Sequence, residues 1–216
     1  MYRVNDIFYS LQGEGFWSGT PMVFLRLSGC NLRCPFCDTD FSDFREMEAA
    51  DIVRELEETA TSGCRRVCIT GGEPSLQLDS LLIDAIHRAG FQIHLETNGT
   101  RPLPPGIDWI TLSPKTDFVG AVQGRVVLPE ADELKLVYTG KNDPSEWAGF
   151  PAAYHFLQPC DLGEVCPADG GDAPAGRAGN EADIEAPDTT SATLRYALSH
   201  PEWRVSLQIH KILGIA

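Results

Sequence analysis

The chain has 216 residues, of which 43% are hydrophobic, and its 31 Asp and Glu against 17 Lys and Arg give a formal net charge of -14. This length predicts one domain with a sizeable core, and an acidic chain without a basic stripe is a poor partner for nucleic acid. The sequence has no apolar run of about eighteen residues to span a membrane and no signal-peptide layout at its start. We therefore expect a cytoplasmic protein whose partner is a small molecule or a protein.

Strand-like and helix-like patterns alternate along the chain. Runs rich in β-branched and aromatic residues predict strands at 21–29, 65–70, 91–97, 108–113, 133–138, 154–158 and 203–210. Amphipathic periodicity predicts crossover helices at 47–60 and 76–89. This alternation is typical of a mainly parallel sheet that binds ligands at the carboxyl ends of its strands. Because a complete eight-unit barrel takes about 250 residues, we expect an α/β fold with a partial, modified (β/α) barrel.

One stretch, residues 161–188, departs from this alternation. It holds eight Asp and Glu against a single Arg, half of the net negative charge, and is otherwise dominated by Ala, Gly and Pro. Such a composition cannot bury enough apolar surface to order itself. We therefore expect residues 1–216 to form a single domain with an acidic insertion loop at about 161–189, which is either a solvated linker or a docking site for a partner.

Three cysteines concentrate the chemistry on one short loop. Cys30, Cys34 and Cys37 form a C-x3-C-x2-C motif directly after the first of these predicted strands. Cysteines in a reducing compartment stay thiols, so the motif predicts metal binding. Three thiolates can hold a [4Fe-4S] cluster and leave one iron open, whereas structural zinc normally takes four Cys or His ligands. The alternative is a zinc site completed from elsewhere, for instance by Cys64, Cys68, His155 or His210.

The cysteine motif, with Phe36 before its last cysteine, resembles the signature of the radical S-adenosylmethionine (SAM) superfamily. A second motif of that superfamily, GGEP at 71–74, follows a predicted strand and precedes a predicted helix. The resemblance implies that SAM chelates the open iron, that Gly72 and Glu73 contact its amino group, and that one electron then yields a 5'-deoxyadenosyl radical. Without the cysteines, GGEP would be an ordinary strand-to-helix turn.

Within the superfamily, the sequence resembles the 7-carboxy-7-deazaguanine synthase family of the queuosine pathway. This resemblance runs nearly end to end, over IFYSLQGEG (7–15), CDT (37–39), ITGGEP (69–74), ETNG (96–99), SPK (113–115), ELKLV (133–137), LQP (157–159) and SLQIHK (206–211). It implies a carbon–nitrogen lyase that converts 6-carboxy-5,6,7,8-tetrahydropterin into 7-carboxy-7-deazaguanine with loss of ammonia, by hydrogen abstraction at C6 and ring contraction. It also implies a homodimer and a flavodoxin- or ferredoxin-type reductant.

The resemblance further assigns site residues. Those expected to hold SAM are Phe36, Cys37, Asp38, Gly72, Glu73, Ser113, Pro114, Lys115, Gln158, Pro159, Cys160 and Asp161. Those expected to hold the substrate are Leu11, Gln12, Gly13, Glu14, Arg26, Thr70, His210 and Ala216. Thr39 is expected to bind Mg²⁺, a hard ion that prefers oxygen ligands.

Residue chemistry suits such a substrate. A guanine-like ring edge offers donors and acceptors that Gln12 and Glu14 can match, and Arg26 can pair bidentately with a substrate carboxylate. A surface salt bridge is the alternative for Arg26. Glu96 and Asn98 end another predicted strand, where they either join the site or cap the strand end; Lys135, which alternates with apolar residues, receives no role.

Two other functions fit part of the pattern. A radical SAM activase of a glycyl-radical enzyme would share the cysteine triad, but it gives no reason for the LQGEG segment or the terminal HK pair. A zinc-binding scaffold without chemistry would use the same cysteines.

Overall fold

A computed structural model describes residues 1–37, 39–40, 42–61, 63–161 and 188–215. The strands of this part of the chain are β1 (Tyr2–Leu11), β2 (Pro21–Leu27), β3 (Arg45–Met47), β4 (Arg66–Gly71), β5 (Gln92–Thr97), β6 (Trp109–Leu112), β7 (Ala131–Tyr138), β8 (Ala152–Pro159) and β9 (Trp203–Val205). The helices are α1 (Ala49–Thr59), α2 (Ser80–Arg88), α3 (Thr116–Val119), α4 (Thr189–Ser199) and α5 (Ile209–Leu213), with 3-10 turns at Pro74–Leu76 and Pro144–Trp147.

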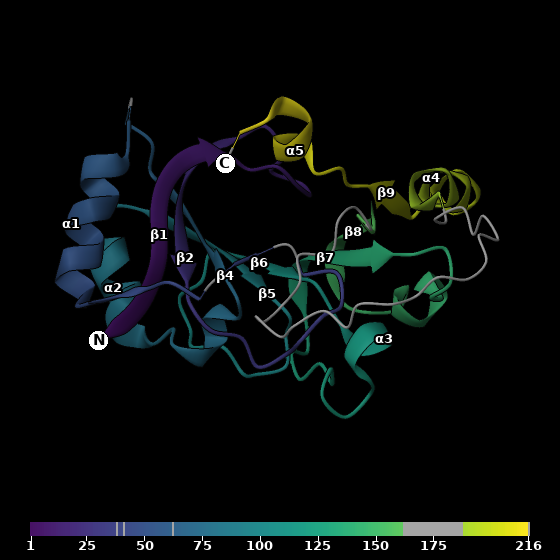
Figure 1. The fold of residues 1–216 in the computed structure, drawn as a ribbon, viewed down its shortest axis with the longest axis horizontal. Helices are drawn as coiled ribbons and strands as arrows, with labels where there is room; N and C mark the ends of the chain where they lie inside the picture. Colours follow the sequence, from purple (N-terminus) through teal and green to yellow (C-terminus); the bar gives the residue numbers. More distant parts are fainter. Residues whose placement is uncertain (38, 41, 62, 162–187, 216) are drawn as a thin grey trace, which may run out of the picture.

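The described strands form one curved sheet in the order β3-β1-β2-β4-β5-β6-β7-β8-β9 (Figure 1). β1 pairs antiparallel with β2 and β3, and every pairing from β2 onward to β9 is parallel. Within the described residues no pairing joins β3 to β9, so the sheet stays open. These features confirm the expected partial, modified (β/α) barrel.

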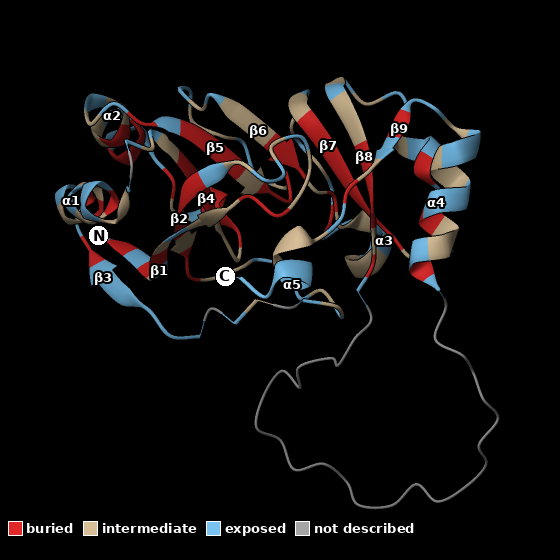
Figure 2. Ribbon diagram, turned by 90° about the horizontal axis from the view of Figure 1, so that it is seen from above, coloured by how far each residue is buried: buried red, intermediate tan, exposed pale blue. Residues whose placement is uncertain are grey.

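Helices α1 and α2 cover the outer face of the first half of the sheet (Figure 2). Ile52 and Leu56 of α1 and Leu82, Ile83 and Ile86 of α2 are at most 1% exposed, and they pack against the outward side chains of β2, β4 and β5. Burial of each such side chain contributes roughly 1.5–3 kcal/mol. The outer core therefore fixes the strands whose carboxyl ends carry the cysteine and GGEP motifs.

Inside the sheet, aromatic rings gather near the amino ends of the parallel strands. Phe16, Trp17, His94, Trp109 and Tyr154 form a group that we call the aromatic floor, with ring centroids of neighbouring members 4.4–6.4 Å apart. Two of these rings come from the loop between β1 and β2, and the others point inward from β5, β6 and β8. The floor fills this end of the barrel and leaves the carboxyl ends of the strands for a cavity.

The structure differs from the sequence expectations at the two ends of the chain. β1 was not predicted, because polar residues such as Asn5 and Asp6 interrupt its apolar pattern. The strand predicted at 203–210 is wrong beyond Val205, where the backbone turns away and Ile209–Leu213 forms α5. Helix α4 was also not predicted, since it buries only Thr189 and Thr193 and so lacks a strong apolar stripe.

The acidic insertion falls mostly on residues 162–187, which lie outside the described residues, so the insertion and the single-domain organisation stay predictions. No helix in the described ranges is both long and apolar enough to cross a membrane.

Candidate active site

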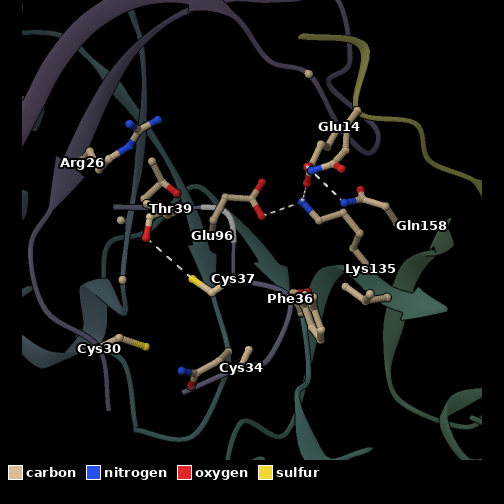
Figure 3. Close-up of a pocket in the computed structure, with 18 of the residues that line it drawn as sticks. Glu14, Arg26, Cys30, Cys34, Phe36, Cys37, Thr39, Glu96, Lys135 and Gln158 are labelled. Atoms are coloured by element: carbon tan, nitrogen blue, oxygen red, sulfur yellow. Dashed lines mark hydrogen bonds and ion pairs between the residues drawn. The ribbon is translucent and has the colours of Figure 1, made fainter. Parts of the chain in front are cut away.

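A cavity of about 810 Å³ opens inside the sheet, at the carboxyl ends of the parallel strands (Figure 3). The parallel topology explains this location, because such strands all deliver their carboxyl ends to the same edge of the sheet. The structure brings the following predicted site residues together in its lining: Leu11, Gln12, Gly13, Glu14, Arg26, Cys30, Cys34, Phe36, Cys37, Thr39, Thr70, Gly72, Ser113, Lys115, Gln158, Pro159, Cys160, Asp161 and His210.

Four predicted residues are placed differently or lie outside the described ranges. Asp38 and Ala216 lie outside them. Pro114 is buried and does not line the cavity. Glu73 also lies beneath the lining, at 1% exposure.

The carboxylate of Glu73 is fully engaged with the protein. It accepts hydrogen bonds from the Ser75 amide (3.0 Å), the Thr97 hydroxyl (2.7 Å) and the Asn98 amide (2.7 Å). A buried carboxylate needs such donors, since an unsatisfied one is costly. Glu73 therefore ties the GGEP turn to the end of β5, and its backbone, rather than its side chain, faces the cysteine loop.

The cysteine loop is held against that turn at close range. The amide of Glu73 donates to the Gly29 carbonyl at 2.9 Å, one residue before Cys30. A Cβ on Gly72 would collide with the same Gly29 carbonyl and with the side chain of Cys30. Only glycine therefore permits this approach of the two motifs.

Asn98 anchors the loop from the other side. Its side-chain Nδ2 donates to Asn31 Oδ1 at 3.1 Å, and Asn31 Nδ2 donates to the Thr100 hydroxyl at 2.8 Å. Asn98 Oδ1 also accepts from the Thr100 amide at 3.0 Å, which is the strand-end capping expected as one alternative. The loop that carries the three cysteines is thus tied to both β4 and β5.

The donor set suits a cluster better than a single ion. All three cysteines line the same cavity, yet within the described residues no three Cys, His or acidic side chains converge on one metal-ion position. In a cubane each cysteine binds a different iron, so its thiolates stand farther apart than the ligands of one zinc ion. Burial raises the pKa of the Cys30 and Cys34 thiols, and bound iron would favour their thiolate forms.

Lys115 lies beside the cysteine loop. Its ammonium donates to Ser113 Oγ at 2.5 Å and to the Ser113 carbonyl at 3.0 Å. Burial lowers the pKa of Lys115, and Cys34 is the largest charge that opposes this shift. On the same side, Phe36 makes an edge contact with Phe118 of α3, with ring centroids 4.4 Å apart. Lys115 and Phe36 belong to the two segments, after β6 and in the cysteine loop, to which the resemblance assigns part of the SAM site.

The loop between β1 and β2 separates the cavity from the aromatic floor. Gln12 and Glu14 line the cavity, whereas Phe16 and Trp17 belong to the floor. Gly13 lies between the two polar residues, and a Cβ there would collide with the ring of His210. Its carbonyl accepts the amide of Ile209 at 2.9 Å, so α5 docks on this loop and delivers His210 to the cavity.

A buried charge network crosses the cavity wall. Lys135 of β7 places its ammonium 2.5 Å from Glu14 Oε2 and 2.8 Å from Glu96 Oε2. Burial raises the pKa of Glu14, but Lys135, Gln208 and other partners outweigh it and lower the pKa to about 2. Burial likewise raises the pKa of Glu96, and here it outweighs Lys135. The pKa of Glu14 therefore lies below that of Glu96.

Glu133 joins this network to the floor. It is 2% exposed, and its Oε2 accepts the Phe16 amide at 3.0 Å. Burial raises its pKa from 4.5 to about 7, with Lys135 opposing the shift. Its protonation state therefore changes near neutral pH.

Arg26 and Thr70 line a further part of the cavity wall, as neighbours in the register of β2 and β4. The guanidinium of Arg26 lies 5.0 Å from the centre of the Phe8 ring, which itself stacks on Phe24 with centroids 5.0 Å apart. This cation–π contact holds the charged group of Arg26 over a fixed surface while it lines the cavity. Cys68, a buried thiol on β4, fills the wall below, 3.7 Å from Gln12 Nε2.

Lys135, Glu133 and Cys68 are among the residues of the cavity and the network to which the sequence motifs assigned no role in binding SAM or the substrate. A signal existed for the first two. Glu133, Lys135 and Val137 alternate with Leu134 and Leu136, and a strand in the middle of a parallel sheet is covered on both faces. A charged residue in such a strand needs buried partners, which marks it as part of a site.

Comparisons with known proteins agree with this geometry. The family model of the Radical SAM superfamily matches residues 25–117. The chain is 42% identical over 215 residues to the 7-carboxy-7-deazaguanine synthase of Bacteroides thetaiotaomicron, covering all of this chain and 99% of that protein. It is 40% identical over 238 residues to the 7-carboxy-7-deazaguanine synthase of Nitratidesulfovibrio vulgaris, covering 99% of each.

A solved structure is similar as well. The crystal structure of QueE from Escherichia coli matches with a TM-score of 0.70 and 25% identity, over 96% of this chain and 93% of that one. Fold, cysteine motif and full-length similarity point the same way: the chain belongs to the 7-carboxy-7-deazaguanine synthase family of the radical SAM superfamily.

Proposed function

We propose that this chain converts 6-carboxy-5,6,7,8-tetrahydropterin into 7-carboxy-7-deazaguanine with loss of ammonia. The observation that carries the proposal is one cavity that joins two unlike walls. On one side the loop of Cys30, Cys34 and Cys37 opens into it, and on the other lie Glu14 and Arg26. A full-length match to relatives named as this synthase supports it over the glycyl-radical activase.

The cysteine side of the cavity is proposed to hold the [4Fe-4S] cluster and SAM. Bound there, the reduced cluster and SAM would together supply the 5'-deoxyadenosyl radical for hydrogen abstraction at C6 of the pterin. The chain's own residues orient SAM: the backbone of Gly72 lies against the cysteine loop, and Ser113 with Lys115 and the Gln158–Asp161 segment line the adjoining wall. The ammonium of Lys115 suits a carboxylate, and Phe36 suits the face of an adenine.

The opposite side is proposed to hold the pterin. The 2-amino-4-oxo edge of the pterin ring carries N–H groups, which can donate hydrogen bonds to carboxylates. It also carries a carbonyl oxygen, which can accept a hydrogen bond from an amide nitrogen. Glu14 and Gln12 supply such groups, together with the backbone at Leu11 and Gly13. Arg26 and His210 reach the same cavity from two other elements and suit the substrate carboxylate.

Magnesium is proposed to bind at Thr39. This residue lines the cavity beside Cys37, on the side toward Arg26 (Figure 3). Asp40 and Ser42 line the same stretch and offer further oxygen atoms. A hard cation there would neutralise part of the charge of a substrate carboxylate. Turnover should then depend on Mg²⁺ and fall when Thr39→Val removes the hydroxyl.

Three properties of the working enzyme extend the proposal. A flavodoxin- or ferredoxin-type protein is proposed as the electron donor, because the cluster must be reduced by one electron. A cytoplasmic location is proposed because a thiolate-held cluster suits a reducing compartment. A homodimer is supported by the exposed apolar side chains of Ile212 and Leu213, 71% and 56% exposed, which a second copy would cover.

Anaerobic reconstitution with iron and sulfide tests the function. The holoenzyme is then reduced with SAM, Mg²⁺ and 6-carboxytetrahydropterin, and the product is followed by mass. We expect 7-carboxy-7-deazaguanine, with released ammonia. Formation of 5'-deoxyadenosine without that product would keep the radical SAM chemistry and reject this substrate, and a colourless protein without cluster would reject both.

An Arg26→Ala variant separates the two walls. The KM for the pterin should rise, while uncoupled SAM cleavage and iron content stay at the level of the unmodified chain, because Arg26 lies away from the cysteine loop. Removal of a charge-assisted contact to a carboxylate should cost about tenfold or more in KM. Unchanged pterin kinetics would remove Arg26 from the proposed substrate site.

A further inference from the structure

Lys135 is the most completely enclosed cation of the cavity wall. It is 4% exposed, and it lines the cavity from the middle of β7. Its ammonium meets carboxylates from two distant segments, Glu14 in the loop after β1 and Glu96 near the end of β5. Figure 3 shows the ammonium lying between these two carboxylates. One buried cation therefore joins three separate elements of the barrel.

Neutral amides hold the remaining oxygens of the two carboxylates. Glu14 Oε1 accepts from Gln158 Nε2 at 3.1 Å and Gln208 Nε2 at 2.9 Å, and Glu96 Oε1 accepts from Gln12 Nε2 at 3.3 Å. An ionised carboxylate has about four acceptor sites. Within the described residues, three are therefore used on Glu14 and two on Glu96, which leaves acceptor capacity on both for a bound ligand.

The charge balance makes Lys135 indispensable to this arrangement. Besides Lys135, the titratable groups that act on the pair are Glu133 on the same strand, Lys115 after β6, His210 from α5 and the Cys68 thiol of β4. Of the two lysines, only Lys135 contacts the carboxylates, because Lys115 donates to Ser113. Two facing buried carboxylates without a cation between them would share a proton.

We propose that Lys135 is a positioning residue that keeps Glu14 and Glu96 ionised and fixed, so that the cavity selects a ring edge with adjacent N–H donors. This inference rests on the proposed function and deepens it. Lys135 acts through the carboxylates, whose acceptor sites face the ligand. A protonated carboxyl in either place would present a donor to the ring edge and reject it.

Direct binding of 6-carboxypterin to the anaerobic holoenzyme, followed by its fluorescence, tests the proposal without turnover. 6-Carboxypterin has the same ring edge with adjacent N–H donors, and its binding involves no hydrogen abstraction. The binding test therefore stays valid even if the proposed reaction does not occur. The variants are Lys135→Met, Lys135→Gln and Lys135→Arg. The matched control is Lys141→Met, which makes the same change of charge at an exposed residue outside the cavity.

We expect Lys135→Met and Lys135→Gln to weaken binding by about 30-fold or more at pH 7, since loss of one partner leaves buried charge unpaired. Their loss of affinity relative to the unmodified chain should become smaller as pH rises from 6 to 8, because the two carboxyl groups lose the shared proton at higher pH and can again accept hydrogen bonds. Lys135→Arg should recover most of the affinity, and Lys141→Met should change it by less than about twofold.

Iron content and melting temperature of each variant accompany the titrations. A deficit that is the same at every pH and is shared by Lys135→Arg would mean that Lys135 only supports the fold, and would overturn the proposal. Binding within about threefold of the unmodified chain in both neutral variants would overturn it as well. Should Lys135→Met fail to load the cluster, the Lys135→Gln and Lys135→Arg pair decides by the same criteria.

Discussion

The aromatic floor and the cavity above it are built from the same strands, but the floor buries aromatic rings and the cavity wall buries charged side chains. His94 and Glu96 both point inward from β5, two residues apart, yet one packs between indole rings and the other holds an ion pair with Lys135. The floor buries rings that need no ligand, while the cavity buries charges that a ligand can use. On a single strand, a residue that packs in the floor is thus followed, two positions later on the same face, by a residue that lines the cavity.

The loop between β1 and β2 makes this division possible. Its polar residues Gln12 and Glu14 turn to the cavity, and Phe16 and Trp17 turn to the floor. The LQGEG segment is therefore a partition between two environments as well as a source of ligand contacts. Substitutions on the two sides should separate loss of activity from loss of stability.

The largest effect is expected at the cavity's metal end. Cys34→Ala removes one of three cluster ligands, so iron content, colour and product formation should all be lost, while the fold persists because this loop lies outside the main cores. Iron and sulfide analysis after reconstitution, with circular dichroism as the control for folding, checks this. Full SAM cleavage by the variant would contradict the ligand assignment.

The next effect belongs to the floor. Trp109 contacts four of the other rings, so Trp109→Ala should lower the free energy of unfolding by roughly 3–5 kcal/mol, as for other large-to-small core changes. Trp109→Phe should lose much less, because the indole Nε1 is buried with no hydrogen-bond partner among the described residues, so its removal breaks no hydrogen bond with them. Chemical denaturation measures both variants.

In both Trp109 variants, the KM for the pterin should stay near that of the unmodified chain. A rise in KM that matches the loss of stability would show that floor and cavity do not act separately.

The smallest effect is expected at Glu133, where the two regions meet. Its pKa is raised by burial to about 7, so between its unfolded value of 4.5 and pH 7 the folded chain binds the proton more tightly than the unfolded chain. This contribution to stability is present at low pH and is lost as pH rises through 7. Glu133→Gln keeps an oxygen for the Phe16 amide and cannot ionise.

Relative to the unmodified chain, Glu133→Gln should therefore gain roughly 2–3 kcal/mol in unfolding free energy between pH 5 and pH 8. Denaturation curves at several pH values test this. A difference that stays constant across that range would mean that Glu133 is not the group that titrates.

The parallel part of the fold could be predicted from the sequence because its strands are short apolar runs bounded by turn residues. Segments such as 66–71 and 92–97 are buried on both faces or end at the cavity, so their composition alone identifies them. β1 and α4 could not be found in this way. One alternates polar with apolar residues, and the other is held mainly by Asp188 at its start and by two buried threonines.

Much the same contrast holds for the site. The cysteine loop and GGEP turn are local motifs, so their spacing suffices to recognise them. Lys135 is recognisable only through its partners, and Glu14 and Glu96 lie far away in the chain. A sequence shows that a charge interrupts a strand but does not show which carboxylates will meet it, because that depends on the register of several strands.

The open side of the barrel has a consequence for how the protein is made. No strand closes it in the described part of the chain; instead the Ile209 amide reaches the Gly13 carbonyl, and the Gly15 amide reaches the Ser206 hydroxyl. During synthesis the ribosome delivers the cysteine loop early and residues 206–209 late. Until residues 206–209 are made, the nascent chain therefore carries its three cysteines beside a wall that lacks these two hydrogen bonds. We therefore expect iron and sulfide to be inserted after residues 206–209 have docked on the loop between β1 and β2.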